Sequence, residues 1–184
     1  MTSLDVLVIA AHPDDAEISA GGTILRLVDA GARVGVLDVT RGEMGTRGSR
    51  EDRDVETARA TEILGLAWRG NLNLPDGRVA ATTEAREEVA RHLRSLGPDL
   101  VIAHHAHDPH PDHEASALLA ANPTVEAALK AAEGKTPVVY PRGEAGAALK
   151  DGWEEPSSGW VIFGNPTTIE KDQKQWGASL ARAA

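Results

Sequence analysis

The stretch LDVLVIAAHPDDAE, residues 4–17, joins an apolar run to a dense group of charged side chains. An almost continuous apolar run of this length is typical of a strand that is buried on both faces of a parallel sheet. The run stops at His12, Pro13, Asp14 and Asp15, and ligands of open parallel sheets bind outside the carboxyl ends of the strands. The stretch therefore predicts a central strand with a candidate site at its end.

Strand-like and helix-like segments alternate along the chain after this first strand. Further apolar runs at residues 33–39 and 99–103 indicate buried strands. Apolar residues at helical spacing, with glycine or proline stop signals, predict helices around residues 24–31, 55–64, 85–96 and 111–121. Because single helices between strands imply right-handed crossovers, we expect an α/β fold. It would be a Rossmann-like three-layer sandwich with a mostly parallel sheet and an active site at the C-terminal ends of the strands.

The signals weaken toward the C-terminus. Residues 122–134 fit another helix that begins at an Asn-Pro pair. The run WVIFG at residues 160–164 indicates a strand, and residues 167–184 fit a polar helix. The length of the chain predicts one domain over residues 1–184.

The composition restricts the classes of partner and metal site. A formal net charge of −9 repels phosphate backbones and anionic lipids, so we expect a small-molecule substrate and neither nucleic acid nor a membrane as partner. With no cysteine, any bound metal must be held by His, Asp or Glu. The N-terminus has no basic region, and its apolar run of about eight residues is too short for a signal peptide or a membrane span, which predicts a cytoplasmic protein.

A second group of chemistry-bearing side chains follows another strand. The stretch HHAHDPHPDH, residues 104–113, holds five histidines in ten positions directly after a predicted buried strand. A catalytic zinc commonly takes two histidines and one carboxylate and leaves one position open for water, and His12, Asp15 and His113 can supply that set. Asp14 would then lie beside a ligand, with its carboxylate available to accept a proton.

Each group also has a plainer interpretation. Either group could be a polar loop whose aspartate caps the next helix. For His104, His105 and His107 we favour roles behind the ligands, along a pocket or at the surface, because a catalytic zinc seldom takes more than three protein ligands. The loop TRGEMGTRGSREDR, residues 40–53, matches no nucleotide-binding pattern, although its arginines can wall a pocket.

Four segments together resemble one enzyme family. The segments AHPDDAEISAGGT, TRGEMGTRG, NLNLPDG and HPDH, all within residues 4–120, resemble the LmbE-like (PIG-L) zinc-dependent N-deacetylases. This family contains the N-acetylglucosaminyl-phosphatidylinositol deacetylases and the N-deacetylases of mycothiol and bacillithiol biosynthesis, and the chain looks most similar to the bacillithiol-pathway N-acetylglucosaminyl conjugate deacetylases. The resemblance implies removal of the N-acetyl group from an N-acetylglucosamine conjugate that is similar to a bacillithiol or mycothiol precursor.

The resemblance implies a catalytic core with separate roles for neighbouring residues. His12, Asp15 and His113 look like the ligands of one zinc ion per chain, although Fe²⁺ or another divalent ion is also compatible with this ligand set. Asp14 looks like the general base that deprotonates the zinc-bound water, which is the nucleophile. His110 looks like the residue that helps to stabilise the oxyanion.

The resemblance extends to residues around this core and to assembly. Asp112 would orient His110, and Arg53 and Glu43 match positions that would contact the substrate. The partner would be a small-molecule N-acetyl amino sugar. Because family members form trimers or hexamers, the resemblance also implies a homo-oligomer.

This sequence departs from the family in two places. Pro109 stands where bacillithiol-like enzymes usually carry an arginine, and residues 141–184 do not match the family's C-terminal region, which indicates altered substrate recognition. An alternative function is therefore a metal-containing sugar-binding domain with impaired or no turnover. A metal-dependent phosphoesterase is a third interpretation, which would need a second metal site or extra carboxylates near the first.

Overall fold

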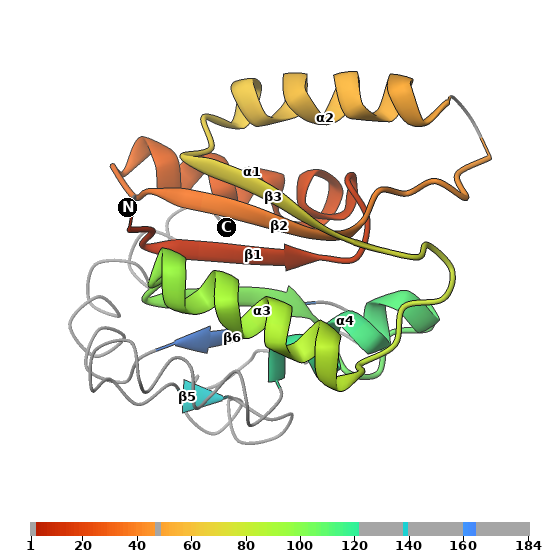
Figure 1. Cartoon of the computed structure of the whole chain (residues 1–184). Helices are drawn as coiled ribbons and strands as arrows, with labels where there is room; N and C mark the ends of the chain where they lie inside the picture. The colour runs from red at the N-terminus through yellow and green to blue at the C-terminus, as the bar shows by residue number, and fades with distance from the viewer. Residues whose placement is uncertain (1–2, 47–48, 122–137, 140–159, 165–184) are drawn as a thin grey trace, which may run out of the picture.

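A six-stranded sheet forms the middle of the protein, whose structure is a computed structural model that describes residues 3–46, 49–121, 138–139 and 160–164. The strand order is β3-β2-β1-β4-β6-β5. The strands are β1 (Val6–Ala10), β2 (Val34–Thr40), β3 (Trp68–Leu74), β4 (Leu100–His104), β5 (Val138–Val139) and β6 (Trp160–Gly164). β1, β2, β3 and β4 are parallel to one another, whereas β6 runs antiparallel to both of its neighbours. The sheet is mostly parallel, as predicted (Figure 1).

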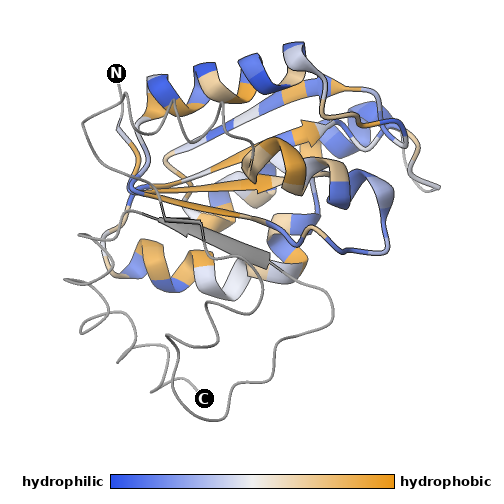
Figure 2. Ribbon diagram, turned by 90° about the horizontal axis from the view of Figure 1, so that it is seen from below, coloured by the Kyte–Doolittle hydropathy of each residue, from blue (hydrophilic) through white to orange (hydrophobic). Residues whose placement is uncertain are grey.

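Helices cover both faces of this sheet. They are α1 (Asp15–Asp29), α2 (Arg50–Leu64), α3 (Thr83–Leu96) and α4 (Pro111–Ala121). Successive residues of a strand point to opposite faces, so Val8 packs in one core with Ile24 of α1, and Ile9 packs in the other core with Leu93 of α3. Figure 2 shows the apolar strands between helices whose outer faces are hydrophilic. The predicted three-layer α/β sandwich is confirmed.

The strand order brings the two charged segments of the sequence to one place. β1 lies between β2 and β4, so the chain first builds the sheet on one side of β1 and later returns to its other side. Such a reversal opens a crevice at the carboxyl ends of the two central strands. Val8 of β1 faces Ile102 of β4, so His12 and residues 104–113 follow these strands at the same edge. The reversal therefore explains why segments about a hundred residues apart share a site.

Several element boundaries differ from the predicted ones. α1 begins at Asp15, directly after the charged loop and earlier than its apolar spacing indicates. α2 begins at Arg50, also earlier than predicted, because the side chains of Ser49 and Asp52 cap its first turn reciprocally. The sequence pattern does not indicate β3, since the segment WRGNLNL carries an arginine and two asparagines. The apolar pattern therefore does not predict β3 or the first turns of α1 and α2, because these segments are rich in polar residues.

The elements predicted near the C-terminus are covered only in part. The strand at residues 160–164 is confirmed as β6. The predicted helices at residues 122–134 and 167–184 lie outside the described residues. No described helix has the length and apolar character needed to cross a membrane.

Candidate metal centre

Histidine side chains converge on Asp15 at the carboxyl edge of β1 and β4. The Asp15 Oδ2 atom accepts a hydrogen bond from the backbone N–H of His12 at 2.9 Å and lies 3.1 Å from His12 Nδ1. His113, in the first turn of α4, places Nε2 3.3 Å from the same oxygen. One ligand atom from each of these three residues lies within 4.8 Å of the others. The structure thus brings together the three residues that we predicted as zinc ligands.

The donor set and its surroundings fit a divalent transition metal. Two imidazoles and one carboxylate are common ligands of a catalytic zinc with an open position. Asp108 Oδ1 lies 3.1 Å from His113 Nδ1, which orients the ring so that Nε2 faces Asp15. His104 Nε2 accepts a hydrogen bond from the backbone N–H of Ala11 at 3.0 Å, and the His104 ring stacks on that of His113 with centroids 4.0 Å apart. Asp108 and His104 therefore contact the ring of His113, and these three residues also form a second possible donor set.

Asp15 dominates the electrostatics of this group. Burial raises the pKa of Asp15, but hydrogen bonds with His104, His113 and His12 outweigh burial and hold this pKa well below its usual range. Burial lowers the pKa of His12, but the hydrogen bond and charge of Asp15 and the hydrogen bond with Asp112 outweigh it and raise the pKa to about 9. A protonated histidine beside an ionised carboxylate marks a place where a divalent cation can replace the proton.

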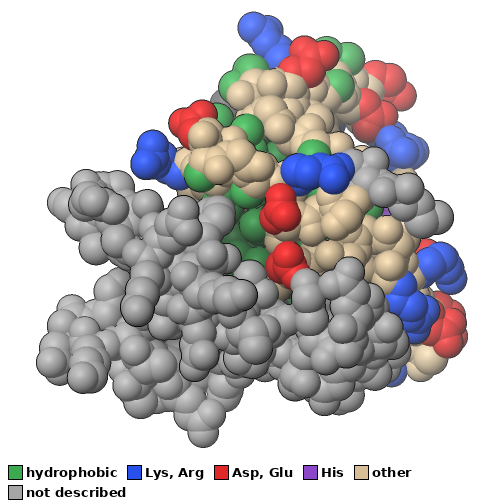
Figure 3. All heavy atoms as spheres, turned by 90° about the vertical axis from the view of Figure 1, so that its left-hand side faces the viewer, with side chains coloured by type: hydrophobic (Ala, Val, Ile, Leu, Met, Phe, Trp, Pro, Cys, Tyr) green, Lys and Arg blue, Asp and Glu red, His purple; other side chains and the backbone are tan. Residues whose placement is uncertain are grey.

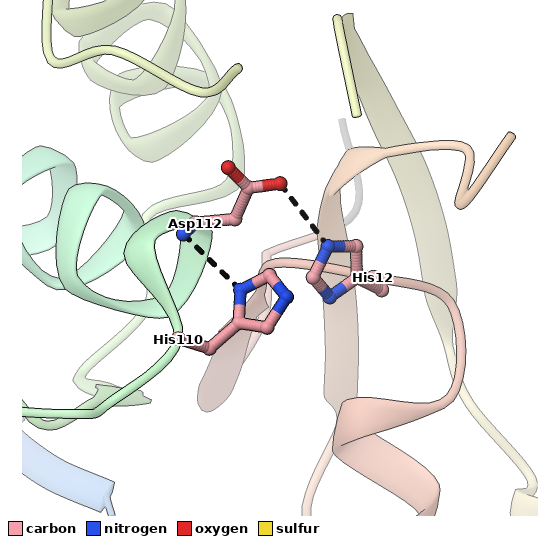
Figure 4. Close-up of side chains that lie close together, drawn as sticks. All are labelled: His12, His110 and Asp112. Atoms are coloured by element: carbon pink, nitrogen blue, oxygen red, sulfur yellow. Dashed lines mark hydrogen bonds and ion pairs between the residues drawn. The ribbon is translucent and has the colours of Figure 1, made fainter. Parts of the chain in front are cut away.

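His110 and Asp112 approach His12 from the other edge of its ring (Figure 4). The Asp112 carboxylate lies 3.3 Å from His12 Nε2 and also accepts the backbone N–H groups of Gly77 and Val79 at 2.7 and 3.1 Å. The backbone N–H of Asp112 donates to His110 Nδ1 at 3.2 Å. Asp112 therefore contacts His110 through its backbone, while its side chain holds His12 and the turn after β3. Because Nδ1 accepts, a neutral His110 carries its proton on Nε2.

The Pro-Asp-Gly turn after β3 closes the site from a third direction. Asp76 Oδ1 lies 3.1 Å from His12 Nε2, and Asp76 Oδ2 accepts the backbone N–H of Met44 at 2.7 Å. Glu43, which we predicted as a substrate contact, accepts the backbone N–H of Asp76 at 3.1 Å. Glu43 thus ties the loop at residues 41–46 to the turn. The Pro-Asp-Gly sequence predicts a turn but does not identify Asp76 as a residue near the site. The position of Asp76 in the motif NLNLPDG is the one sequence signal that could have identified it.

Asp14 and Arg53 border a pocket of about 370 Å³ between the start of α1 and α2. Arg53 Nη1 lies 3.4 Å from Asp14 Oδ2. A Cβ atom at Gly45 would lie 2.4 Å from Arg53 Nη2, so the glycine leaves room for the guanidinium. Asp14 is the N-cap residue of α1, but its side chain makes no capping hydrogen bond. The Asp14 carboxylate therefore pairs with Arg53 and does not cap α1 through its side chain. The pocket is lined by Pro13, Asp14, Glu17, Arg53, Glu56, Thr57 and Ala60.

The opposite end of the parallel strands has a different character. Figure 3 views the molecule from the end where β1 begins, and the acidic and basic side chains of the described residues are scattered there. The histidines and aspartates of the site instead follow the carboxyl ends of β1 and β4. The chemistry-bearing side chains therefore gather at the edge that the sequence predicted.

Two curated proteins are similar in sequence to much of this chain. The diacetylchitobiose deacetylase of Thermococcus kodakarensis is 35% identical over 124 residues, which cover 62% of this chain and 46% of that protein. The probable N-acetyl-alpha-D-glucosaminyl L-malate deacetylase 2 of Bacillus anthracis is 31% identical over 148 residues, which cover 73% of this chain and 64% of that protein. The chain thus spans about half to two thirds of the length of these relatives.

A solved structure and a family model also match this chain. The conserved protein TT1542 of Thermus thermophilus matches with a TM-score of 0.61 at 50% identity, over 64% of this chain and 53% of that chain. A family model described as PIG-L, GlcNAc-PI de-N-acetylase, matches residues 7–153, which include both segments of the candidate metal centre. The chain therefore belongs to the PIG-L family, as the resemblance of its motifs implies.

Proposed function

We propose that this protein is a metal-dependent hydrolase that removes the N-acetyl group from a small N-acetylglucosamine conjugate. The observation that carries this proposal is the convergence of His12, Asp15 and His113 at the carboxyl edge of β1 and β4. Asp14 is adjacent to Asp15 in the sequence, and its carboxylate makes no capping hydrogen bond. The deacetylase names of the relatives from T. kodakarensis and B. anthracis support the same reaction class. Zinc is the proposed ion, since two histidines and one carboxylate suit it well.

The residues around the centre have complementary tasks in this reaction. A divalent ion held by His12, Asp15 and His113 would polarise the acetyl carbonyl and lower the pKa of a water in the site. Asp14 accepts a proton from the water as it attacks the carbonyl carbon. His110 donates its Nε2–H to the oxygen on which negative charge develops.

The second half of the reaction breaks the carbon–nitrogen bond. The amine of the sugar needs a proton to leave, and Asp14 or His110 supplies it. The products are acetate and a free amino sugar. Arg53, which lines the pocket with Asp14, would contact sugar hydroxyls or an anionic part of the conjugate.

The direct test is an assay of acetate and amine release from N-acetylglucosamine conjugates with neutral, inositol and malate substituents. The Asp14→Asn variant should lower kcat by about 10²- to 10⁴-fold, because a general base is lost, and should leave Zn²⁺ affinity unchanged. Asp29→Asn is the matched control, since Asp29 is an exposed aspartate at the other end of the same helix. Full activity of Asp14→Asn would refute the proposed base. Tight sugar binding without acetate release would favour the alternative of a binding domain without turnover.

A further inference from the structure

A buried ion-pair group lies behind the candidate metal centre, between the sheet and α1. Arg69 of β3 donates from Nε and Nη2 to the two carboxylate oxygens of Asp38 of β2, at 2.7 and 3.0 Å. Its third nitrogen, Nη1, donates to Glu17 Oε1 of α1 at 2.5 Å. The side chains of Arg69 and Asp38 are only 7% and 2% exposed. The fork of one guanidinium therefore joins two strands to a helix.

The same guanidinium contacts the loop that carries the site. Arg69 Nη2 donates to the backbone carbonyl of Pro13 at 3.4 Å. Pro13 lies between His12 and the pair Asp14 and Asp15, and Glu17 follows within the first turn of α1. Arg69 thus contacts both ends of the segment from Pro13 to Glu17. This segment carries the candidate ligand Asp15 and the candidate base Asp14, and it directly follows the candidate ligand His12.

Stability alone does not account for this group. Burying charged groups carries a large desolvation cost before their attraction is counted, and apolar residues of similar size are often at least as stabilising. The group also carries two carboxylates for one guanidinium, and Glu17 Oε2 is buried without a hydrogen-bond partner among the described residues. This ion-pair group contacts the site loop at two points in spite of its desolvation cost. A need to fix the geometry of that loop explains the group better than a gain in stability does.

We propose that Arg69 is a positioning residue, which fixes the His12–Asp15 loop in its metal-binding geometry through Pro13 and Glu17. Arg69 itself is neither a candidate ligand nor part of the pocket lining. The inference that this loop serves catalysis rests on the proposed function. The inference that it serves metal binding does not need substrate turnover.

Two variants test this role without leaving the buried group wholly unpaired. Arg69→Lys keeps the positive charge but cannot span Asp38, Glu17 and Pro13 together. Glu17→Ala removes the contact of Arg69 with α1 and leaves the Asp38–Arg69 pair intact. Because Glu17 also lines the pocket, the Zn²⁺ affinity of this variant is the deciding readout. Arg91→Lys is the control, because Arg91 forms an exposed ion pair with Glu88 on α3.

Zn²⁺ affinity, measured by competition with a colorimetric chelator well below each variant's melting temperature, is the main readout. Both site variants should bind Zn²⁺ about tenfold more weakly, the lower end of the effect of groups that orient metal ligands, while Arg91→Lys should not change. In the zinc-loaded enzyme, both should lower kcat more than they change KM. Reduced melting temperature with unchanged Zn²⁺ affinity and kcat would overturn the proposal and leave only a structural role.

This readout also separates the positioning role from the proposed function. If the unaltered protein releases no acetate but Arg69→Lys still weakens Zn²⁺ binding, the positioning role stands and the proposed function fails. If the unaltered protein is active and both variants bind Zn²⁺ normally with normal kcat, the positioning role fails and the proposed function stands.

Discussion

His12 must lose a proton before it can bind a metal ion, because its pKa in the metal-free protein is raised to about 9. Below that pH the ring is mainly protonated, so each bound ion displaces a proton, and the displacement becomes easier as pH rises. Zn²⁺ affinity should therefore increase by about tenfold per pH unit between roughly pH 6 and pH 8 from His12 alone. The increase should be steeper where His113 is also protonated, because burial lowers its pKa but hydrogen bonds with Asp15 and Asp108 outweigh burial and raise it as well. The measurement is a competition titration at several pH values in this range.

A control tests whether a histidine outside the centre contributes to this dependence on pH. His92 lies on α3, where its ring packs against Trp68 at a centroid distance of 5.5 Å, outside the candidate centre. His92→Gln should keep the same dependence of Zn²⁺ affinity on pH. An affinity that does not vary with pH in the unaltered protein would contradict the raised pKa of His12.

Single residues differ in how far the sequence predicts them. His12, Asp15 and His113 could be predicted because their residue types and their positions after apolar strands are both visible in the sequence. Arg69 and Asp38 could not be predicted as partners, since their contact depends on how β3 aligns with β2. A carboxylate inside the apolar run VGVLDVT is a signal that Asp38 needs a partner. The sequence does not say which residue that partner is.

At the level of the elements, the start of α2 depends on one capping box. Ser49 Oγ accepts the backbone N–H of Asp52 at 3.1 Å, and Asp52 Oδ2 accepts the backbone N–H of Ser49 at 2.8 Å. Ser49→Ala should lower the free energy of unfolding by about 1 kcal/mol, which corresponds to a fall of roughly 2–4 °C in Tm for a chain of this length. Calorimetry or thermal melting followed by circular dichroism measures this change.

Ser19→Ala provides the comparison for this cap. Ser19 is exposed within α1, where alanine has the higher helix propensity, so its Tm should stay the same or rise slightly. An equal loss of Tm in both variants would show that the cap of α2 has no special role.

The elements also show why apolar spacing gives only part of the boundaries. The apolar positions of α3 match its predicted helix closely, because one face of α3 packs on the sheet. In α2 only Leu64 is buried, so apolar spacing indicates the end of this helix and not its polar start. β3 is similarly hidden, since its side chains are mostly half-buried and several are polar. The bounds of amphipathic elements can therefore be predicted from apolar spacing. The bounds of polar elements can be predicted only when the residues that cap or pair with them are known.

At the level of the whole molecule, the order of the strands creates the candidate centre. Neither HPDD nor HPDH forms the three-residue donor set alone, and the set exists because β1 and β4 are neighbours in the sheet. The sequence predicts an α/β fold with the site at this edge, since strands and helices alternate. It does not predict the closing role of the turn after β3, because β3 itself is not visible as a strand.

One divalent ion at this edge should support deacetylation, and titration of metal-free protein with Zn²⁺ during the acetate-release assay measures whether it does. We expect no activity without metal, activity that saturates near one ion per chain, and loss of both tight binding and activity in His113→Ala. Full acetate release by the metal-free protein, or none at saturating Zn²⁺ with any of the N-acetylglucosamine conjugates, would show that the protein is not a metal-dependent deacetylase of this class.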